Sequence, residues 1–138
     1  MQTRGFSLIE LIFSMAVMGL LMAVMVPAFG KVRDRALETS VKAVALSIQT
    51  SIETYGSDNN LYPDGSYSVA DLSSALISAG ALSSVPQNPF TQATYTSSDS
   101  AGKIVYASVS DGSGYTLTAY KRDGSTVLLT VAGGTAES

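Results

Sequence analysis

The hydrophobic pattern of the chain begins with an apolar run from residue 8 to residue 29 that contains one carboxylate, Glu10. Between Leu11 and Phe29 no side chain is ionisable, and Ser14 is the only polar one. The 22 residues of the run make a helix of about 33 Å, long enough to cross the hydrocarbon core of a bilayer. The run is too long for the apolar segment of a typical secretory signal peptide. It predicts a membrane-spanning helix, in which a carboxylate costs about 2.5–3.5 kcal/mol at the bilayer centre and needs a partner.

Beyond Pro27 the pattern changes to one apolar residue every three or four positions, with charged and polar residues largely between them. This spacing predicts an amphipathic helix that continues the span. Pro27 removes one backbone donor, so we expect it to bend the helix rather than end it. The polar stretch over residues 56–60 predicts the end of a single helix of about 50 residues, roughly 75 Å long. The apolar positions after the proline are Val32, Ala36, Val41, Val44, Ala45, Ile48, Ile52 and Tyr55.

A second, shorter helix is predicted over residues 68–78. Ser68 stands at its start with Asp71 three residues later, which is typical of a capped helix N-terminus, and Gly80 closes it. The stretch LYPDGSY before this helix predicts a turn because Pro, Asp and Gly are characteristic turn residues.

The last third of the chain has the pattern of an antiparallel sheet. Pro86 and Pro89 remove backbone donors, so residues 83–100 are predicted to form a long irregular loop. Three β-prone runs follow, and Asp-Gly pairs between them predict hairpins. Alternating apolar positions would let three strands pack on the amphipathic helix. The runs are 103–110, 115–121 and 126–131, with Tyr115, Leu117, Ala119, Val127, Leu129 and Val131 as the apolar positions.

Composition excludes most catalytic chemistry. The 138 residues include no cysteine and no histidine, which removes disulfides, thiol nucleophiles, Cys/His zinc sites and His-based triads. The candidate carboxylates for acid–base chemistry lie in turn-like sequence, where Asx turns explain them. We therefore expect a protein that is not an enzyme. The carboxylates are Asp58, Asp64, Asp99 and Asp111.

Charge argues against a nucleic-acid partner. Residues 56–138 contain three basic and seven acidic side chains, a net charge of −4. Such a surface does not attract nucleic acid through its bulk charge. A role in DNA uptake would need a basic patch, and Lys121-Arg122 is the only candidate in this part of the chain.

The stretch RGFSLIEL at residues 4–11 resembles the processing motif of type IV pilins and pseudopilins. The resemblance implies that a prepilin peptidase cuts between Gly5 and Phe6 and that the new N-terminal residue, Phe6, is N-methylated. It also implies that Glu10 is the fifth mature residue, a position that this family keeps acidic. Further along the run, Gly19 falls where the family has a helix-loosening glycine, and Pro27 likewise falls at the family's proline.

The family resemblance suggests a partner for Glu10. In a filament of staggered parallel helices its carboxylate can pair with the methylated amine of Phe6 on its own or a neighbouring subunit. The alternative is a carboxylate that snorkels to the membrane interface, where the helix macrodipole also favours it. We prefer the assembly role because of the motif around Glu10.

The resemblance further implies an α+β, lollipop-like pilin fold in three parts. Residues 1–5 are a leader peptide, residues 6–30 a transmembrane and filament-core helix, and residues 31–138 the amphipathic helix with a globular head. Before assembly the chain would lie in the inner membrane with Arg4 on the cytoplasmic side. This orientation rests on the family, since basic residues flank both ends of the span.

The implied partners are those of a filament subunit. They are further copies of the chain, joined through parallel N-terminal helices, the prepilin peptidase and methylase, and an inner-membrane assembly platform with its ATPase. The assembled subunit would lie in an extracellular pilus filament, with cell adhesion or motility as possible uses, or in a periplasmic pseudopilus.

Two roles within the family stay open. Tyr62-Pro63 and the stretches GALSSVPQNPF and YTLTAYKRDG resemble the major pseudopilin of type II secretion systems, whose terminal loop binds calcium through carboxylates. Asp123 fits such a ligand, but residues 125–131 contain no second acid. We therefore prefer a hairpin turn to a calcium site, expect no cofactor, and favour the pilus subunit over the secretion pseudopilin.

Three aromatic residues lie on the helix or just after it, and their spacing is similar to that of pilins proposed to align rings for electron transport. An aromatic residue on an apolar helical stripe is normally part of a core. We interpret these residues as packing residues: Phe29, Tyr55 and Tyr62.

Overall fold

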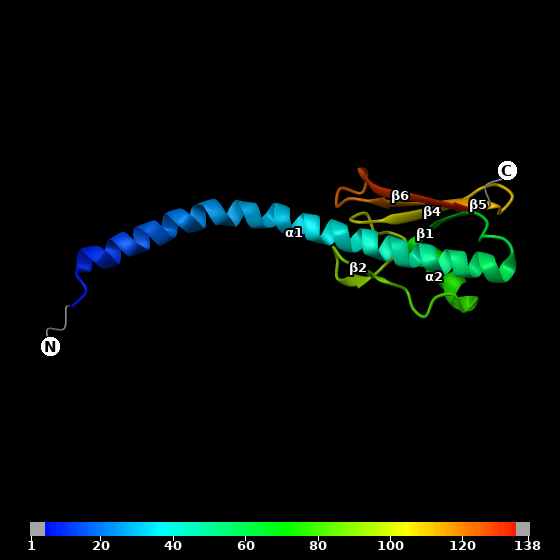
Figure 1. The fold of residues 1–138 in the computed structure, drawn as a ribbon, viewed down its shortest axis with the longest axis horizontal. Coiled ribbons are helices and arrows are strands. Elements are labelled where there is room, and N and C mark those ends of the chain that lie inside the picture. The colour runs from blue at the N-terminus through cyan, green and yellow to red at the C-terminus, as the bar shows by residue number, and fades with distance from the viewer. Residues whose placement is uncertain (1–4, 135–138) are drawn as a thin grey trace. The chain divides into compact units, whose positions relative to one another are not determined.

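The computed structural model describes residues 5–134 of the chain (Figure 1). Two compact units are present, Met1–Arg35 and Ala36–Ser138, and helix α1 (Leu8–Asn59, 52 residues) contributes to both. A small antiparallel sheet follows the helix, so the predicted α+β class is confirmed. The leader peptide begins with residues 1–4, which lie outside the described residues. Its cleavage and the functional division into 1–5, 6–30 and 31–138 stay predictions.

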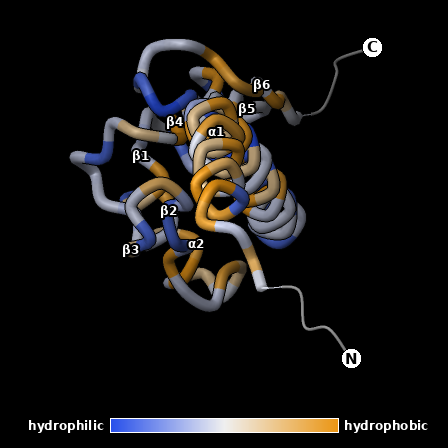
Figure 2. The backbone as a smooth tube through the Cα atoms, turned by 90° about the vertical axis from the view of Figure 1, so that its left-hand side faces the viewer, coloured by the Kyte–Doolittle hydropathy of each residue, from blue (hydrophilic) through white to orange (hydrophobic). Residues whose placement is uncertain are grey.

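The N-terminal unit consists of the first part of α1. Its apolar window is long enough to cross a membrane, and none of that window is buried within the chain. Pro27 lies inside the helix, which continues without a break, as predicted. Figure 2 shows that the turns of α1 nearest the viewer are mostly hydrophobic. An apolar helix with this much exposed surface needs a lipid or protein environment.

In the C-terminal unit, one face of α1 is buried. Its buried positions follow the three- and four-residue spacing that the sequence predicts. Val32, part of the same predicted stripe, lies in the N-terminal unit and is 62% exposed. Only the stripe from Val41 onward therefore forms core. The buried positions of α1 are Val41, Ala45, Ile48, Ser51 and Ile52.

The end of α1 differs in detail from the expected stop. Gly56 lies within the helix, and a Cβ built on it would lie 2.5 Å from the Tyr62 ring. Asn60 instead takes the left-handed conformation, with φ of 59°, just after the last helical residue. Gly56 thus permits the close approach of the Tyr62 ring, and the helix ends before Asn60.

The main sheet has four antiparallel strands in the order β1-β4-β5-β6. The three predicted strands are confirmed as β4 (Ile104–Ser108), β5 (Gly114–Tyr120) and β6 (Val127–Gly134). The sequence pattern did not predict β1 (Ser66–Ser68), which lies in the expected turn. Its three residues pair with β4, Tyr67 opposite Tyr106, so tertiary pairing creates this strand.

A β-bulge places the first residue of β6 on the opposite face of the sheet from the one predicted. The register passes from Ala119 opposite Leu129 to Tyr120 opposite Val127, which leaves Leu128 as the extra residue. One extra residue turns the following side chains to the other face of a sheet. Val127 is therefore 52% exposed instead of buried, and Leu128 packs against the core in its place.

Helix α2 (Val69–Ser78) has the predicted start. Ser68 is its N-cap and accepts a hydrogen bond from the backbone N–H of Asp71, while the Ser68 hydroxyl donates to the Asp71 carboxylate at 2.6 Å. Gly80 follows the helix with a φ of 76°, which suits glycine.

The predicted irregular loop over residues 83–100 contains a short second sheet. Strands β2 (Gln87–Asn88) and β3 (Ala93–Thr94) pair antiparallel. Asn88 is fully buried, and its side-chain amide donates to the Ala101 carbonyl at 2.9 Å while its oxygen accepts from the Phe90 N–H at 3.0 Å. One buried amide therefore organises a segment whose two prolines suggested no regular structure.

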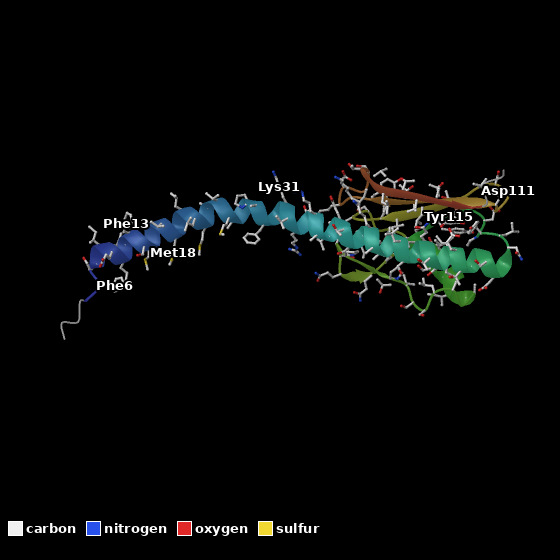
Figure 3. All side chains as sticks on the ribbon, in the orientation of Figure 1. Phe6, Phe13, Met18, Lys31, Asp111 and Tyr115 are labelled. Atoms are coloured by element: carbon white, nitrogen blue, oxygen red, sulfur yellow. The ribbon has the colours of Figure 1, made fainter. Side chains whose placement is uncertain are left out.

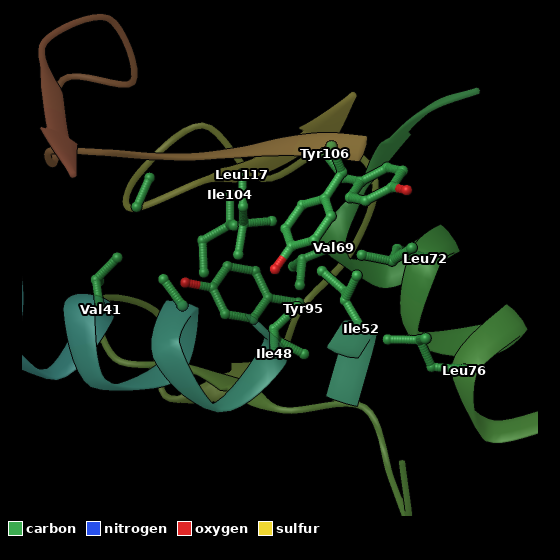
Figure 4. Close-up of a cluster of buried hydrophobic side chains, with 13 residues drawn as sticks. Val41, Ile48, Ile52, Val69, Leu72, Leu76, Tyr95, Ile104, Tyr106 and Leu117 are labelled. Atoms are coloured by element: carbon green, nitrogen blue, oxygen red, sulfur yellow. The ribbon is translucent and has the colours of Figure 1, made fainter. Parts of the chain in front are cut away.

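The core of the C-terminal unit lies where α1, α2 and one face of the sheet meet (Figure 4). Tyr106 and Tyr115 are its largest fully buried side chains. The predicted packing of the amphipathic part of the helix on the sheet is confirmed. The remaining buried core residues are Val41, Ala45, Ile48, Ile52, Val69, Leu72, Leu76, Tyr95, Ile104, Leu117 and Ala119.

Candidate functional site

The predicted cleavage position lies just before the helix. Gly5, Phe6 and Ser7 have no regular secondary structure and are exposed, and α1 begins at Leu8. The Phe6 side chain is 83% exposed (Figure 3). The Gly5–Phe6 peptide bond is therefore free of helical hydrogen bonding and accessible within the described residues. Arg4, the other part of the motif, lies outside them.

Glu10 makes a contact that the sequence analysis missed. Its Oε2 accepts a 3.1 Å hydrogen bond from the backbone N–H of Ser7, and the Ser7 carbonyl accepts from the Leu11 N–H at 3.3 Å. Glutamate at the third helical position, reaching back to the residue before the helix, is one half of a capping box. The signal was present as Ser-x-x-Glu at residues 7–10.

This contact directs the Glu10 carboxylate toward the amino end of the mature chain. It reaches the nitrogen of Ser7, one residue short of the nitrogen of Phe6, which cleavage would turn into an amine. In the uncleaved chain the carboxylate thus contacts the Ser7 nitrogen, and its pairing with a Phe6 amine stays a prediction.

The other polar group of the span is satisfied locally. The Ser14 hydroxyl donates to the Glu10 backbone carbonyl at 2.8 Å, as serine does inside helices. Gly19 and Pro27 both lie within continuous helix. The loosening of the helix between them inside a filament stays a prediction.

The aromatic residues divide into two groups. Tyr55 and Tyr62 pack against the core, as predicted. Phe29 is 67% exposed and lines a shallow apolar hollow with Met25 and Val32, so it packs on no core in the described chain. In the N-terminal unit such a ring has only lipid or another chain to contact.

Glu53 connects two of the tyrosines. Its two carboxylate oxygens accept from the Tyr115 hydroxyl at 2.6 Å and from the Tyr62 hydroxyl at 2.8 Å. Burial and then the Glu53 hydrogen bond raise the pKa of Tyr115, so the hydroxyl stays protonated and remains a donor. The rings of Tyr62 and Tyr115 meet edge to face, with centroids 4.9 Å apart. This cluster is structural, since each polar atom has a protein partner.

Asp123, the candidate calcium ligand, lies in the hairpin turn between β5 and β6, and its carboxylate is bonded within that turn. Asp123 accepts from the backbone N–H groups of Ser125 at 2.9 Å and Thr126 at 2.8 Å, and from the Thr126 hydroxyl. The hydrogen bonds from Thr126, then that from the Ser125 N–H, lower the pKa of Asp123 to about 2. Asp111 accepts from Ser113 in the same manner. Within residues 5–134 no three Asp, Glu, His or Cys side chains gather as metal ligands.

A scan against family models matches residues 1–26 to the prokaryotic N-terminal methylation motif. No curated protein and no solved structure matches the chain. The match covers the predicted cleavage position, Glu10 and most of the apolar run, and these are the residues on which the resemblance rests. The chain therefore carries the N-terminal signature of the type IV pilins and pseudopilins.

Proposed function

We propose that the chain is the structural subunit of a type IV pilus-like filament. It is inserted in the inner membrane as a prepilin, cleaved between Gly5 and Phe6, methylated on Phe6 and polymerised through its N-terminal helix. The observation that carries the proposal is the methylation motif followed directly by an exposed apolar helix. The same motif opens the apolar window of α1, so the residues expected to be processed and the residues expected to pack in a filament are continuous in the chain.

The exposed helix supplies the driving force for assembly. Phe13, Met18 and other large apolar side chains point away from α1 (Figure 3), and Phe13 is 71% exposed. In the membrane these side chains contact lipid, and in a filament they contact the helices of other copies. Exchange of lipid for protein contacts depends on packing rather than on the hydrophobic effect. Because the helix surfaces are almost entirely apolar, a polar contact is needed to fix the axial offset between neighbouring helices.

Glu10 supplies that polar contact in the proposed filament. Its carboxylate is directed toward the start of the helix by the bond to the Ser7 N–H. In the filament this carboxylate would pair with the methylated amine of Phe6 on the same or a neighbouring copy. One ion pair would then replace two separately buried charges, each of which is costly. In the alternative, the Glu10 carboxylate extends to the membrane interface and needs no second copy. Substitution of Glu10 should then leave assembly unchanged.

The implied partners follow from this life cycle. The prepilin peptidase and methylase would act at Gly5 and Phe6, and an inner-membrane platform with its ATPase would add subunits to a growing filament. The final location would be an extracellular filament. The positive-inside rule does not settle the orientation, because Lys31, Arg33 and Arg35 follow the span.

The second candidate is the major pseudopilin of a type II secretion system. The stretches over residues 80–90 and 115–124 that resemble this class favour it. The turn role of Asp123 weighs against it, because its carboxylate oxygens already accept three hydrogen bonds from Ser125 and Thr126. Deletion of the gene separates the two roles: loss of twitching with normal export supports the pilus, and loss of export with intact pili supports the secretion system.

Mass spectrometry of sheared filaments tests the proposed function directly. We expect a mature chain that begins at Phe6 and carries one methyl group on its amine. An N-terminus at Met1 in assembled filaments, or an unmethylated Phe6, contradicts the proposal. Absence of the chain from any sheared filament fraction also contradicts it.

A further inference from the structure

Strand β6 forms one edge of the main sheet (Figure 1). The strand order is β1-β4-β5-β6, so β5 is the only strand that pairs with β6 among the described residues. The opposite edge, β1, has three residues, and α2 follows it directly. The main sheet therefore has one long edge, formed by the eight residues of β6.

The hydrogen bonds of β5 show how the backbone of this part of the sheet is oriented. The Gly114 carbonyl accepts from the Val109 N–H at 2.8 Å, and the Tyr120 N–H donates to the Lys103 carbonyl at 2.9 Å. These even-numbered residues of β5 thus direct their backbone groups away from β6. Residues along an antiparallel strand alternate between its two neighbours. The odd-numbered residues of β5, such as Leu117, therefore bond to β6.

The same alternation identifies the backbone groups of β6 that point away from the sheet. Val131 lies opposite Leu117, so its N–H and C=O are directed toward β5. Its neighbours Thr130 and Ala132 therefore direct their N–H and C=O groups outward. Within residues 5–134 no group forms a hydrogen bond with these outward donors and acceptors. The edge of β6 thus has regularly spaced backbone groups that a further strand can pair with.

The edge of β6 lacks the features that normally prevent pairing with another chain. Such edges are protected by charged side chains, proline, bulges, short length or a covering segment. The sequence contains no charged residue and no proline from Gly124 to Ala136. The bulge at Leu128 lies near the start of β6, and the register is regular from Leu129 to Gly134. β6 therefore presents an unprotected edge over these residues.

The side chains of β6 indicate the chemistry of a strand that fits beside it. Leu129 and Val131 are half-buried, and Leu129 packs against the core. Thr130 and Ala132 lie between them in sequence on the other face and are exposed. Residues that lie opposite each other on neighbouring strands have their side chains on the same face. A strand that alternates apolar residues with small polar ones would therefore extend the core on one face and contact Thr130 and Ala132 on the other.

We propose that the outer edge of β6 binds an extended segment of a partner protein by β-strand addition, an interaction that goes beyond the proposed filament. The bound segment runs antiparallel to β6, which continues the order of the sheet. Its backbone exchanges hydrogen bonds with Thr130 and Ala132, and these bonds supply affinity. Its apolar side chains pack beside Leu129 and Val131, and this packing supplies specificity.

A second copy of the chain fits this edge less well than a separate partner. Antiparallel pairing of β6 with β6 of another copy is an isologous contact, which needs a two-fold axis between the copies. Neighbouring copies in the proposed filament have parallel helices and no such axis between them. Pairing with β1 of another copy would use an edge of only three residues. We therefore assign the edge to an extended segment of a different protein.

A synthetic peptide with the sequence of residues 113–122 is the probe for this edge. It contains β5, the strand that already pairs with β6, in which Tyr115, Leu117 and Ala119 alternate with threonines. Fluorescence anisotropy of the labelled peptide with the purified full-length chain in detergent should show saturable binding. A peptide of the same composition in scrambled order should not bind. Absence of saturable binding, or equal binding of the scrambled peptide, overturns the proposal.

Backbone methylation of the peptide distinguishes strand addition from other modes of binding. Thr116 and Thr118 of the bound peptide should direct their N–H groups toward β6, because the apolar residues between them face the core. N-methylation at these two positions should weaken binding by about tenfold or more. N-methylation at Tyr115 and Leu117 is the matched control and should leave the affinity close to that of the parent peptide. Equal effects of the two modified peptides contradict pairing along β6.

Ala132→Pro tests the edge from the side of the protein. It removes an outward N–H that has no role in the pairing with β5, and proline is tolerated at such positions of an edge strand. Binding of the peptide should weaken by about tenfold, while Tm stays near that of the parent. Ala132→Ser keeps the N–H and should bind as the parent does. Unchanged affinity of Ala132→Pro overturns the proposal. A dimer of the purified chain that Ala132→Pro dissociates also overturns it, because the edge would then belong to a second copy.

Discussion

The hydroxyl of Tyr115 on β5 donates a 2.6 Å hydrogen bond to the carboxylate of Glu53 on α1, across 62 positions of sequence. The second oxygen of Glu53 accepts from Tyr62 at 2.8 Å. One carboxylate therefore holds the sheet and the segment after the helix to α1. Hydrogen bonds to a charged acceptor are among the stronger polar contacts in a folded chain.

Tyr115→Phe should destabilise the C-terminal unit by about 1.5–3 kcal/mol, because a partly buried carboxylate loses one of its two donors. Tyr62→Phe should cost less, since Tyr62 is only partly buried whereas Tyr115 is 1% exposed. Thermal unfolding of the two variants in the same detergent measures the difference. Equal stability of Tyr115→Phe and the parent contradicts this account of Glu53.

Gly133→Ala should destabilise the chain by about 1–3 kcal/mol. A Cβ at Gly133 would collide with the Glu53 carboxylate and with the Tyr115 ring, so the cluster would have to move. Gly30→Ala is the matched control, because a Cβ there meets nothing within 4 Å. Denaturant unfolding should give a lower free energy of unfolding for Gly133→Ala than for Gly30→Ala. An unchanged free energy of unfolding for Gly133→Ala would show that the sheet can shift to accommodate the added Cβ.

Ser73→Ala should stabilise the chain by about 1 kcal/mol. The Ser73 side chain is fully buried on α2, and its hydroxyl has no hydrogen-bond partner among residues 5–134. Its removal relieves the cost of a buried unsatisfied polar group, and alanine also has the higher helix propensity. A rise in Tm is the expected readout, with Ser74→Ala as the exposed neighbour for comparison. A fall in Tm would mean that the hydroxyl contributes a contact after all.

Stability should depend on pH through Asp123. Its pKa is lowered from 3.8 to about 2 by the hydrogen bonds from Thr126 and Ser125. A lowered pKa in the folded state stabilises the fold above the unfolded pKa, and this contribution is lost as the pH falls through about 2. Asp123→Asn should therefore flatten the decline in stability below pH 4. An unchanged acid profile would assign the decline to other carboxylates.

Glu10→Ala should abolish or greatly reduce filament assembly while insertion and cleavage stay largely intact. An apolar residue eases insertion, and the motif at Gly5 and Phe6 is unchanged. The Phe6 amine would enter an apolar environment without its counter-charge, which typically costs about 3–5 kcal/mol. A thousandfold loss in association corresponds to roughly 4 kcal/mol.

Glu10→Gln separates the cap from the charge. Glutamine can keep the capping contact to the Ser7 N–H, which the structure shows, but it cannot pair with an amine. We expect it to assemble at best partially. Sheared filament yield at matched levels of processed subunit is the measurement. Normal assembly of Glu10→Ala would favour the snorkelling carboxylate over the ion pair.

The local elements could be predicted because their signals are local. The apolar run, the helical spacing after Pro27, the Ser68 cap and the Asp-Gly turns each act within a few residues, and the structure confirms the elements they predict. The Ser7–Glu10 capping contact belongs to the same class, since its Ser-x-x-Glu signal was readable in the sequence. The N-terminal methylation motif could be read from the sequence for the same reason, because it is a short continuous stretch of chain.

Tertiary structure decided what depends on pairing between distant segments. Strand β1 exists because β4 offers it an edge, and Val127 is exposed because a bulge shifts the register against β5. Gly56 and Gly133 are glycines because a ring or a carboxylate from elsewhere in the chain lies against them. Local signals thus account for the motif, the helices and the main strands. Which side chains of distant segments meet could not be predicted in this way, because such contacts leave no periodic trace along the chain.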